Sequence, residues 1–202
     1  MFSGLYFDVE HFSGATSMLD DIVIHSVESR DIDYIAELIR RNIMPFTSGE
    51  VFSASVARRS ASLLEVYSQP GSRLFVARLQ NNIAGAPIAC AGVGTLHGLP
   101  LSEGIGEIRD LVVDVSFRGR GIGRRLLRAC LEEARVHKYR SLYLETSTQM
   151  DKARKLFLRS GFRPVTEQHT LSPLHSENTP CYFFMDKLDG ANLEIALKKV
   201  PH

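Results

Sequence analysis

A glycine-rich segment flanked by arginines is the part of the sequence best suited to bind a ligand. It runs from Arg118 to Arg124 and has glycine at every second position, namely Gly119, Gly121 and Gly123. Glycine lacks Cβ and adopts positive φ easily, so successive backbone N–H groups can point into one concavity. The start of a following helix adds unpaired donors and the positive end of its dipole. Because the arginines raise the local potential further, the segment favours a phosphate-bearing ligand.

The spacing argues against two common phosphate-binding loops. A nucleoside-triphosphate loop ends in Gly-Lys-Ser/Thr, whereas Ile122 and Arg124 surround the last glycine here, so neither the lysine nor the magnesium-binding hydroxyl is supplied. A dinucleotide loop requires Gly-x-Gly-x-x-Gly, and its third glycine is missing whether the count starts at Gly119 or at Gly121. Glu145 does stand roughly 20 residues downstream, where a ribose-binding acid would fall.

The segment does match the pattern Arg-x-x-Gly-x-Gly, which a Leu-Val-Val-Asp run precedes at positions 111–114. This resembles the acyl-coenzyme A loop of the GCN5-related N-acetyltransferase superfamily. A second signature of that superfamily follows at the expected distance, Ala153-x-x-Leu156-Phe157-x-x-x-Gly161-Phe162. Two motifs in the right order are far more specific than either alone. Weaker agreement extends over Ile22 to Leu188.

The resemblance implies a mixed α/β (α+β) fold in which helices flank a central mixed β-sheet with splayed parallel strands. The strands that splay would be Glu107 to Val115 and Ser141 to Thr146. Acetyl-CoA would enter between them as co-substrate, with its pantetheine amides bonded to strand backbone and its pyrophosphate held by the loop N–H groups. No metal is implied. The implied cofactor-binding residues are Leu111, Val112, Val113, Arg118, Gly119, Arg120, Gly121, Ile122, Gly123, Arg124 and Phe157.

Glu107 is the candidate catalytic base. An amine must lose a proton before it attacks a thioester, and Glu107 stands eleven residues before Arg118, where histone-type members of the superfamily place their catalytic glutamate. Burial beside apolar neighbours would raise the pKa of this carboxyl towards the working range. The alternative is a strand-end carboxylate paired with Arg109 or another basic group. Strand alternation places Asp110 on the opposite face, so only one of the two acids would point at the acceptor.

Other residues carry weaker indications. Glu145 could bind a cationic amine or pair with an arginine, and His97 could be a base or only a solvated loop residue. The second motif often carries a tyrosine that protonates the departing thiolate, whereas Phe157 stands there in this chain. Tyr143 and Tyr182 are possible substitutes without support from spacing. Met150 replaces a frequent asparagine, which removes a side-chain contact to the cofactor.

Hydrophobic periodicity predicts the elements that position these residues. Glycines at 92 and 94 indicate a bulge or a close backbone approach. We expect the chain to divide into an N-terminal extension (1–21), the transferase-like domain (22–188) and a C-terminal segment (189–202). A short helix is expected over Gly190–His202. Expected strands are Ile22–Val27, Arg73–Leu79, Ile88–Leu96, Ser141–Thr146, Phe162–His169 and Pro180–Leu188. One expected helix has apolar positions from Ile32 to Ile43, is capped by Ser29 or Asp31 and ends before Pro45. The other expected helices are one within Val51–Ser68, one after the glycine loop and one that Asp151 caps and Gly161 ends.

Composition narrows the class of protein. A net charge of +1, with 23% charged residues and no basic tract beyond the loop, argues against a nucleic-acid partner. The three cysteines, Cys90, Cys130 and Cys181, show no zinc-binding spacing and are expected to be reduced and mostly buried. No charged start followed by an apolar block, and no long apolar stretch, indicates a membrane segment. We therefore expect a cytoplasmic protein without a membrane partner.

The leading hypothesis is an N-acetyltransferase that transfers an acetyl group from acetyl-CoA to a primary amine of a small molecule or peptide. The sequence leaves the acceptor and the acyl chain length open. One alternative is a non-catalytic regulatory protein of the same fold that binds acyl-CoA, as the missing tyrosine would allow. Another is a regulator that uses the basic loop on nucleic acid. Dimerisation is common in the superfamily, so the resemblance also allows a homodimer.

Overall fold

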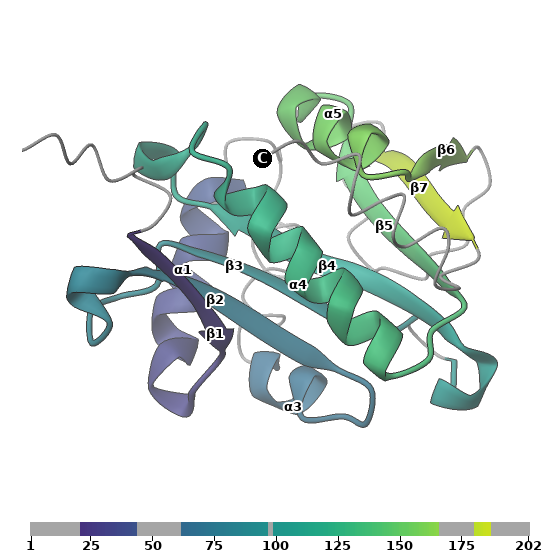
Figure 1. The fold of residues 1–202 in the computed structure, drawn as a ribbon, viewed down its shortest axis with the longest axis horizontal. Coiled ribbons are helices and arrows are strands. Elements are labelled where there is room, and N and C mark those ends of the chain that lie inside the picture. The colour runs from purple at the N-terminus through teal and green to yellow at the C-terminus, as the bar shows by residue number, and fades with distance from the viewer. Residues whose placement is uncertain (1–20, 44–61, 97–98, 166–179, 187–202) are drawn as a thin grey trace, which may run out of the picture.

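A computed structural model describes residues 21–43, 62–96, 99–165 and 180–186 (Figure 1). Its strands form one seven-stranded sheet in the order β1-β2-β3-β4-β5-β7-β6. β4 and β5 are parallel, and the other neighbouring pairs are antiparallel. The strands are β1 (Ile22–Ser26), β2 (Arg73–Leu79), β3 (Ala89–Thr95), β4 (Ile105–Val113), β5 (Ser141–Ser147), β6 (Arg163–Val165) and β7 (Pro180–Asp186).

Helices cover both faces of the sheet, as the α/β prediction requires. α4 (Ile122–Val136) crosses one face, while α1 (Ile32–Ile43) and the short α3 (Leu63–Tyr67) lie behind the sheet in Figure 1. α5 (Asp151–Arg159) follows β5. Two buried apolar clusters result, one between α4 and the sheet and one between the sheet and the α1 and α3 helices. No helix in the part of the chain that the structure describes is both long and apolar enough to cross a membrane.

Each long helix buries the apolar stripe that its sequence predicts. Ile35, Leu38 and Ile39 of α1 are at most 2% exposed, and α4 buries residues from Ile122 to Ala134 along one side. Cys90 and Cys130 are buried and free, as expected. Burial raises the pKa of the Cys130 thiol well above its usual value, so this thiol stays protonated. The side chain of Cys181 lies outside the described residues.

Several predicted boundaries shift for local reasons. β4 ends at Val113 rather than Val115, because the Asp114 side chain accepts a hydrogen bond of 2.9 Å from the Ser116 N–H and starts the 3₁₀ turn Val115–Phe117. Asp151 is the first residue of α5 rather than its cap.

The structure describes only 62–68 of the second predicted helix. Residues 166–169 and 187–188 of the late hairpin and the predicted terminal helix lie outside the described residues, and so does the N-terminal extension apart from Asp21. The domain division therefore stays a prediction.

β4 and β5 are paired along only part of their length. The parallel register runs from Ile105 opposite Ser141 to Ile108 opposite Leu144. Beyond that point β4 stays paired with β3 as far as Val113, and β5 stays paired with β7 as far as Ser147. The two central strands therefore separate towards their carboxyl ends. This is the splay that the resemblance implies.

A bulge in β4 corrects one prediction. Val112 pairs with Cys90 and Arg109 pairs with Gly92, so two residues of β4, 110 and 111, lie opposite the single residue between Cys90 and Gly92. Asp110 takes the left-handed conformation, with φ of 55°. The extra residue reverses the alternation of side chains. The prediction that Asp110 lies on the opposite face from Glu107 is therefore wrong.

A buried ion pair links the strand β2 to the start of α1. Arg78 and Asp31 are each 1% exposed, and the guanidinium donates to the carboxylate. The same carboxylate accepts a hydrogen bond of 3.0 Å from the Glu28 N–H, and Arg78 Nε donates to His25 Nε2 at 3.1 Å. Sequence analysis did not predict this pair, because its members are far apart in the chain.

Removing one member of this pair should destabilise the fold strongly. Asp31→Ala leaves the Arg78 charge buried without its carboxylate, so the free energy of unfolding should fall by about 3–5 kcal/mol. Urea unfolding followed by circular dichroism measures it. The control is Asp33→Ala on the exposed side of the same helix turn, which should cost less than about 1 kcal/mol through the helix dipole. Equal effects of the two variants would contradict the account.

Candidate functional site

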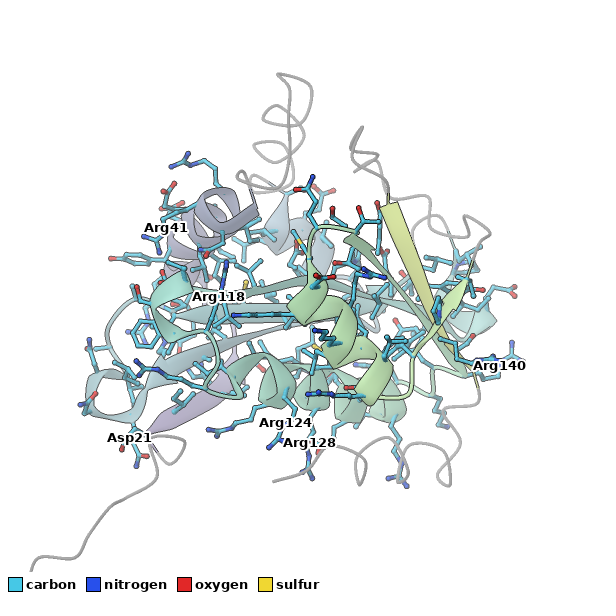
Figure 2. The ribbon with its side chains drawn as sticks, turned by 90° about the horizontal axis from the view of Figure 1, so that it is seen from above. Asp21, Arg41, Arg118, Arg124, Arg128 and Arg140 are labelled. Atoms are coloured by element: carbon cyan, nitrogen blue, oxygen red, sulfur yellow. The ribbon has the colours of Figure 1, made fainter. Side chains whose placement is uncertain are left out.

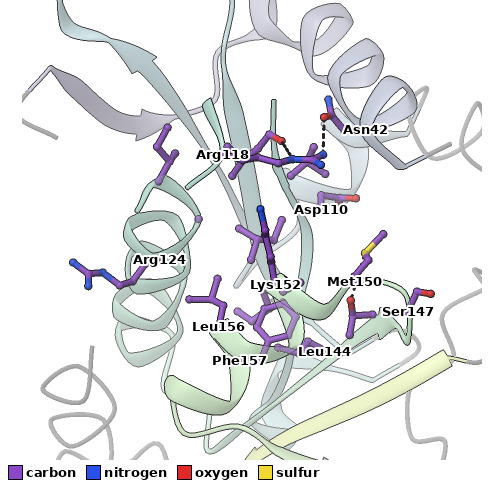
Figure 3. Close-up of a pocket in the computed structure, with 18 of the residues that line it drawn as sticks. Asn42, Asp110, Arg118, Arg124, Leu144, Ser147, Met150, Lys152, Leu156 and Phe157 are labelled. Carbon is purple, nitrogen blue, oxygen red and sulfur yellow. Dashed lines mark hydrogen bonds between the residues drawn. The ribbon is translucent and has the colours of Figure 1, made fainter. Parts of the chain in front are cut away.

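A cavity of about 750 Å³ opens where β4 and β5 separate (Figure 3). Its walls come from β4, the glycine loop and first turn of α4, the end of β5, and the first turns of α5. Of the twelve residues that the sequence predicts for the site, eleven line it: Glu107, Leu111, Val112, Val113, Arg118, Gly119, Gly121, Ile122, Gly123, Arg124 and Phe157. Arg120 does not, because its guanidinium lies over the Phe117 ring at 5.3 Å.

The backbone of the glycine loop borders one end of the cavity. Gly119 and Gly121 have φ of 82° and 72°, and Gly121 is the residue that precedes the first turn of α4. A Cβ added at Gly119 would meet no atom within 4 Å, so its backbone borders open space. The first N–H groups of α4 have no partner within the helix, and they carry the positive end of its dipole. The loop therefore presents backbone donors to an anion at one end of the cavity.

The backbone of Val113 faces the gap between the strands. The next residue, Asp114, donates its N–H to the Ile88 carbonyl on the β3 side at 2.9 Å. Neighbouring residues of a strand direct their polar groups to opposite sides, so those of Val113 point away from β3. Arg118 Nε donates to the Val113 carbonyl at 3.0 Å. That carbonyl has a second lone pair and can accept another hydrogen bond.

The last turn of α1 holds the segment between β4 and the glycine loop. Asn42 is 6% exposed, accepts a hydrogen bond of 2.8 Å from the Arg118 guanidinium and donates to the Leu38 carbonyl at 2.9 Å (Figure 3). Its neighbour Arg41 forms an ion pair with Asp114. Arg41 and Arg118 lie close to α1, whereas Arg124 and Arg128 extend from α4 in a different direction (Figure 2). Sequence analysis missed Asn42, because no local pattern connects α1 to the loop.

Charged residues gather on the α3 side of the sheet, next to the splay. Glu107 is 3% exposed, and its Oε2 lies 3.9 Å from Arg109 Nε. The Arg109 guanidinium lies 5.7 Å from the centre of the Tyr67 ring, and the Tyr67 hydroxyl donates to Asp110 Oδ2 at 2.6 Å. The bulge thus brings Asp110 to the face that Glu107 and Arg109 already share. The expected pairing of Glu107 with Arg109 is present at a distance of 3.9 Å.

Glycines in β3 make room for these side chains. A Cβ at Gly92 would lie 2.2 Å from the Tyr67 hydroxyl oxygen, and a Cβ at Gly94 would lie 2.4 Å from an Arg109 guanidinium nitrogen. Both distances are far below van der Waals contact. The close approach predicted from the two glycines is therefore confirmed.

The second motif forms the apolar wall of the cavity. Phe157 is 5% exposed, packs edge-on against Phe162 with ring centres 6.1 Å apart, and has no hydroxyl to donate. Tyr143 does not line the cavity, and the side chain of Tyr182 lies outside the described residues, as does His97. Glu145 lines the cavity, as does Lys152, which the sequence did not single out. Among the described residues, no group of three His, Cys, Asp or Glu side chains is placed to hold a metal ion.

Comparison with known proteins decides the family. A model of the acetyltransferase (GNAT) family matches residues 38–162, which is more than half of the chain and includes both motifs. The chain belongs to the GNAT family. The fold agrees: the structure of yncA from Salmonella typhimurium, solved with its cofactor acetyl-CoA, superposes with a TM-score of 0.60 over 84% of this chain and 95% of that one, at 17% identity.

Curated relatives match this GNAT chain over shorter stretches. N-acetylaspartate synthetase from Xenopus tropicalis is 33% identical over 119 residues, covering 57% of this chain and 41% of the relative. N-alpha-acetyltransferase RimI from Mycobacterium tuberculosis is 40% identical over 81 residues, covering 40% of this chain and 48% of the relative. The matches thus span about half the length of these relatives.

Exchanging single glycines tests the loop geometry. Gly121→Ala puts a Cβ on a residue with positive φ, which costs about 1–2 kcal/mol. The free loop should therefore leave this conformation, and acetyl-CoA, which needs the conformation restored, should bind roughly tenfold more weakly. Gly123→Ala is the matched control, because Gly123 is helical and its Cβ would make only ordinary contacts of 3.6 Å with Leu156 and Val113. Isothermal titration with acetyl-CoA measures both. Weaker binding by the Gly123 variant than by the Gly121 variant would contradict this geometry.

Proposed function

We propose that this protein is an N-acetyltransferase that moves the acetyl group of acetyl-CoA directly to a primary amine of a small molecule or peptide. The observation that carries the proposal is the separation of β4 from β5 after Ile108 and Leu144, next to a glycine loop whose residues line the same cavity. Membership of the GNAT family and the acetyl-CoA bound to a protein of the same fold support it.

The cofactor would occupy the gap between the two strands. The pyrophosphate would bind the loop amides from Arg118 to Arg124, where the helix dipole also favours negative charge. The pantetheine arm would run along β4 as an added strand and bond the backbone at Leu111 and Val113, whose alternating positions face away from β3. Phe157 would pack against the arm from the α5 side. Arg120 would act only through its backbone, since its side chain lies on Phe117.

The reaction would be a direct attack by the amine nitrogen on the thioester carbonyl carbon. Glu107 lines the cavity one residue before the last paired step of β4 and β5, and it would take a proton from the attacking amine, directly or through a water molecule. A backbone N–H near Val113 would stabilise the tetrahedral oxyanion. Collapse of the intermediate then breaks the carbon–sulfur bond and releases coenzyme A. Because Phe157 cannot donate a proton, the departing thiolate would take its proton from solvent.

One observation favours a second candidate, a regulatory protein that binds acyl-CoA without turnover. The wall that would meet the departing sulfur contains Phe157 instead of a proton donor. Saturable binding of acetyl-CoA, without release of thiol by any member of a broad amine panel, would identify this alternative.

Cytoplasmic location and a homodimer stay predictions. The relatives named for N-acetylaspartate and for N-alpha-acetylation support amine acceptors of small-molecule and peptide type, respectively.

Replacing the candidate base tests the proposed reaction. Glu107→Gln keeps the size of the side chain but removes its basicity, so turnover should fall by about 10²- to 10⁴-fold, while acetyl-CoA affinity stays nearly unchanged. Thiol release measured over a range of pH, together with titration of acetyl-CoA, gives both quantities. Glu103→Gln, at an exposed position shortly before β4, is the matched control and should keep full turnover. An unchanged pH–rate profile in the Glu107 variant would exclude Glu107 as the base.

A further inference from the structure

Arg109 places a buried donor in the wall of the cavity. Its side chain is 15% exposed, and its Nε atom is buried without a hydrogen-bond partner among the residues that the structure describes. Glu107 Oε2, at 3.9 Å, is within ion-pair distance of Nε but too far for a hydrogen bond. A buried donor left unpaired costs about 1–3 kcal/mol, and more for a charged group. Such a donor beside a ligand cavity calls for a partner that the described residues do not supply, and the partly exposed Arg109 side chain lines that cavity.

The surroundings of Arg109 hold its guanidinium in place. The Tyr67 ring lies 5.7 Å from it, and the Tyr67 hydroxyl is in turn fixed by Asp110 at 2.6 Å. The guanidinium also occupies the space above Gly94 that any larger residue would fill. A donor held in this way does not have to be ordered when a ligand binds, so the cost of binding is lowered.

The charges around Arg109 specify what the ligand must offer. Two carboxylates line the same cavity: Glu107 Oε2 lies 3.9 Å from Arg109 Nε, and Asp110 accepts from the hydroxyl of the Tyr67 ring that the guanidinium faces. A positive group beside a negative one is complementary to a molecule that carries an amine and a carboxylate close together. An α-amino acid has both groups on one carbon atom. Its carboxylate can accept from the guanidinium, which is suited to carboxylates in shape and charge, while its amine points to Glu107.

We propose that Arg109 binds the carboxylate of the acceptor, so that the acceptor is a free amino acid rather than a simple amine or a peptide end. This rests on the proposed transferase function and narrows its acceptor. Arg109 is then a specificity-determining residue. An acceptor without a carboxylate would bury the guanidinium donor unpaired, and sites built around such a hydrogen bond discriminate strongly against analogues that lack the partner.

The wild-type protein tests this without any substitution. Thiol release from acetyl-CoA is measured with free α-amino acids, including alanine and aspartate, with the matching α-amino amides, and with a peptide amide whose only amine is N-terminal. The free acids should have kcat/KM at least about 100-fold above the amides. Amide formation lowers the pKa of the amine and so increases its reactive neutral fraction, which biases the comparison against the proposal.

The outcomes separate this inference from the proposed function. Amides or the peptide amide that react as well as free acids would overturn the role of Arg109 while leaving the transferase function intact. If no amine of any kind causes thiol release, both the role of Arg109 and the transferase function are overturned. Selective turnover of free acids supports both.

A variant assigns the selectivity to Arg109. Arg109→Gln should reduce the ratio of kcat/KM between free acid and amide towards one, whereas Arg128→Gln should leave it unchanged, because Arg128 is exposed on α4 and pairs with Glu132 (Figure 2). Titration with acetyl-CoA shows whether each variant is folded. Arg109→Lys keeps the positive charge but loses the planar guanidinium that can donate two parallel hydrogen bonds to a carboxylate. It should give an intermediate ratio of kcat/KM between free acid and amide, and it is decisive if the Gln variant does not fold. A wild-type ratio in a folded Arg109→Gln or Arg109→Lys protein would overturn the assignment.

Discussion

The loss of hydrogen bonding between β4 and β5 is the constraint on which the rest of the structure depends. The strands pair only from Ile105 with Ser141 to Ile108 with Leu144, and each then continues with a different partner. Neither strand needs the other to remain extended, so the gap persists without exposing a whole strand edge. It does leave backbone groups of β4, such as those of Val113, directed into a cavity. Such groups form a template for an extended ligand with amides of its own.

Two sets of contacts hold the ends of the gap between β4 and β5 in place. At one end, α4 begins at the glycine loop, and the last turn of α1 attaches to the same segment through Asn42 with Arg118 and Arg41 with Asp114. At the other end, the β4 bulge brings charged side chains together against the Tyr67 ring, and glycines in β3 leave the space they require. The end that we propose binds the diphosphate is therefore built mostly from backbone, and the end that we propose binds the acceptor is built mostly from side chains.

This division explains what the sequence could predict. Glycine spacing, the apolar stripe of α4 and the small residues of β3 are local patterns, and each predicted its element or contact correctly. The face of Asp110 could not be read from alternation, because one residue in a left-handed conformation reverses the pattern. The roles of Asn42 and of the Arg78–Asp31 pair depend on contacts between distant segments, which no local pattern contains.

The central claim is that acetyl-CoA lies in the gap along β4 with its diphosphate on the glycine loop. Hydrogen–deuterium exchange with and without saturating acetyl-CoA measures this directly, since exchange slows where backbone amides become bonded or covered. The account predicts protection concentrated in peptides that span residues 111–124, with much smaller changes in β1 and β2. Saturable binding that leaves exchange across 111–124 unchanged would contradict it.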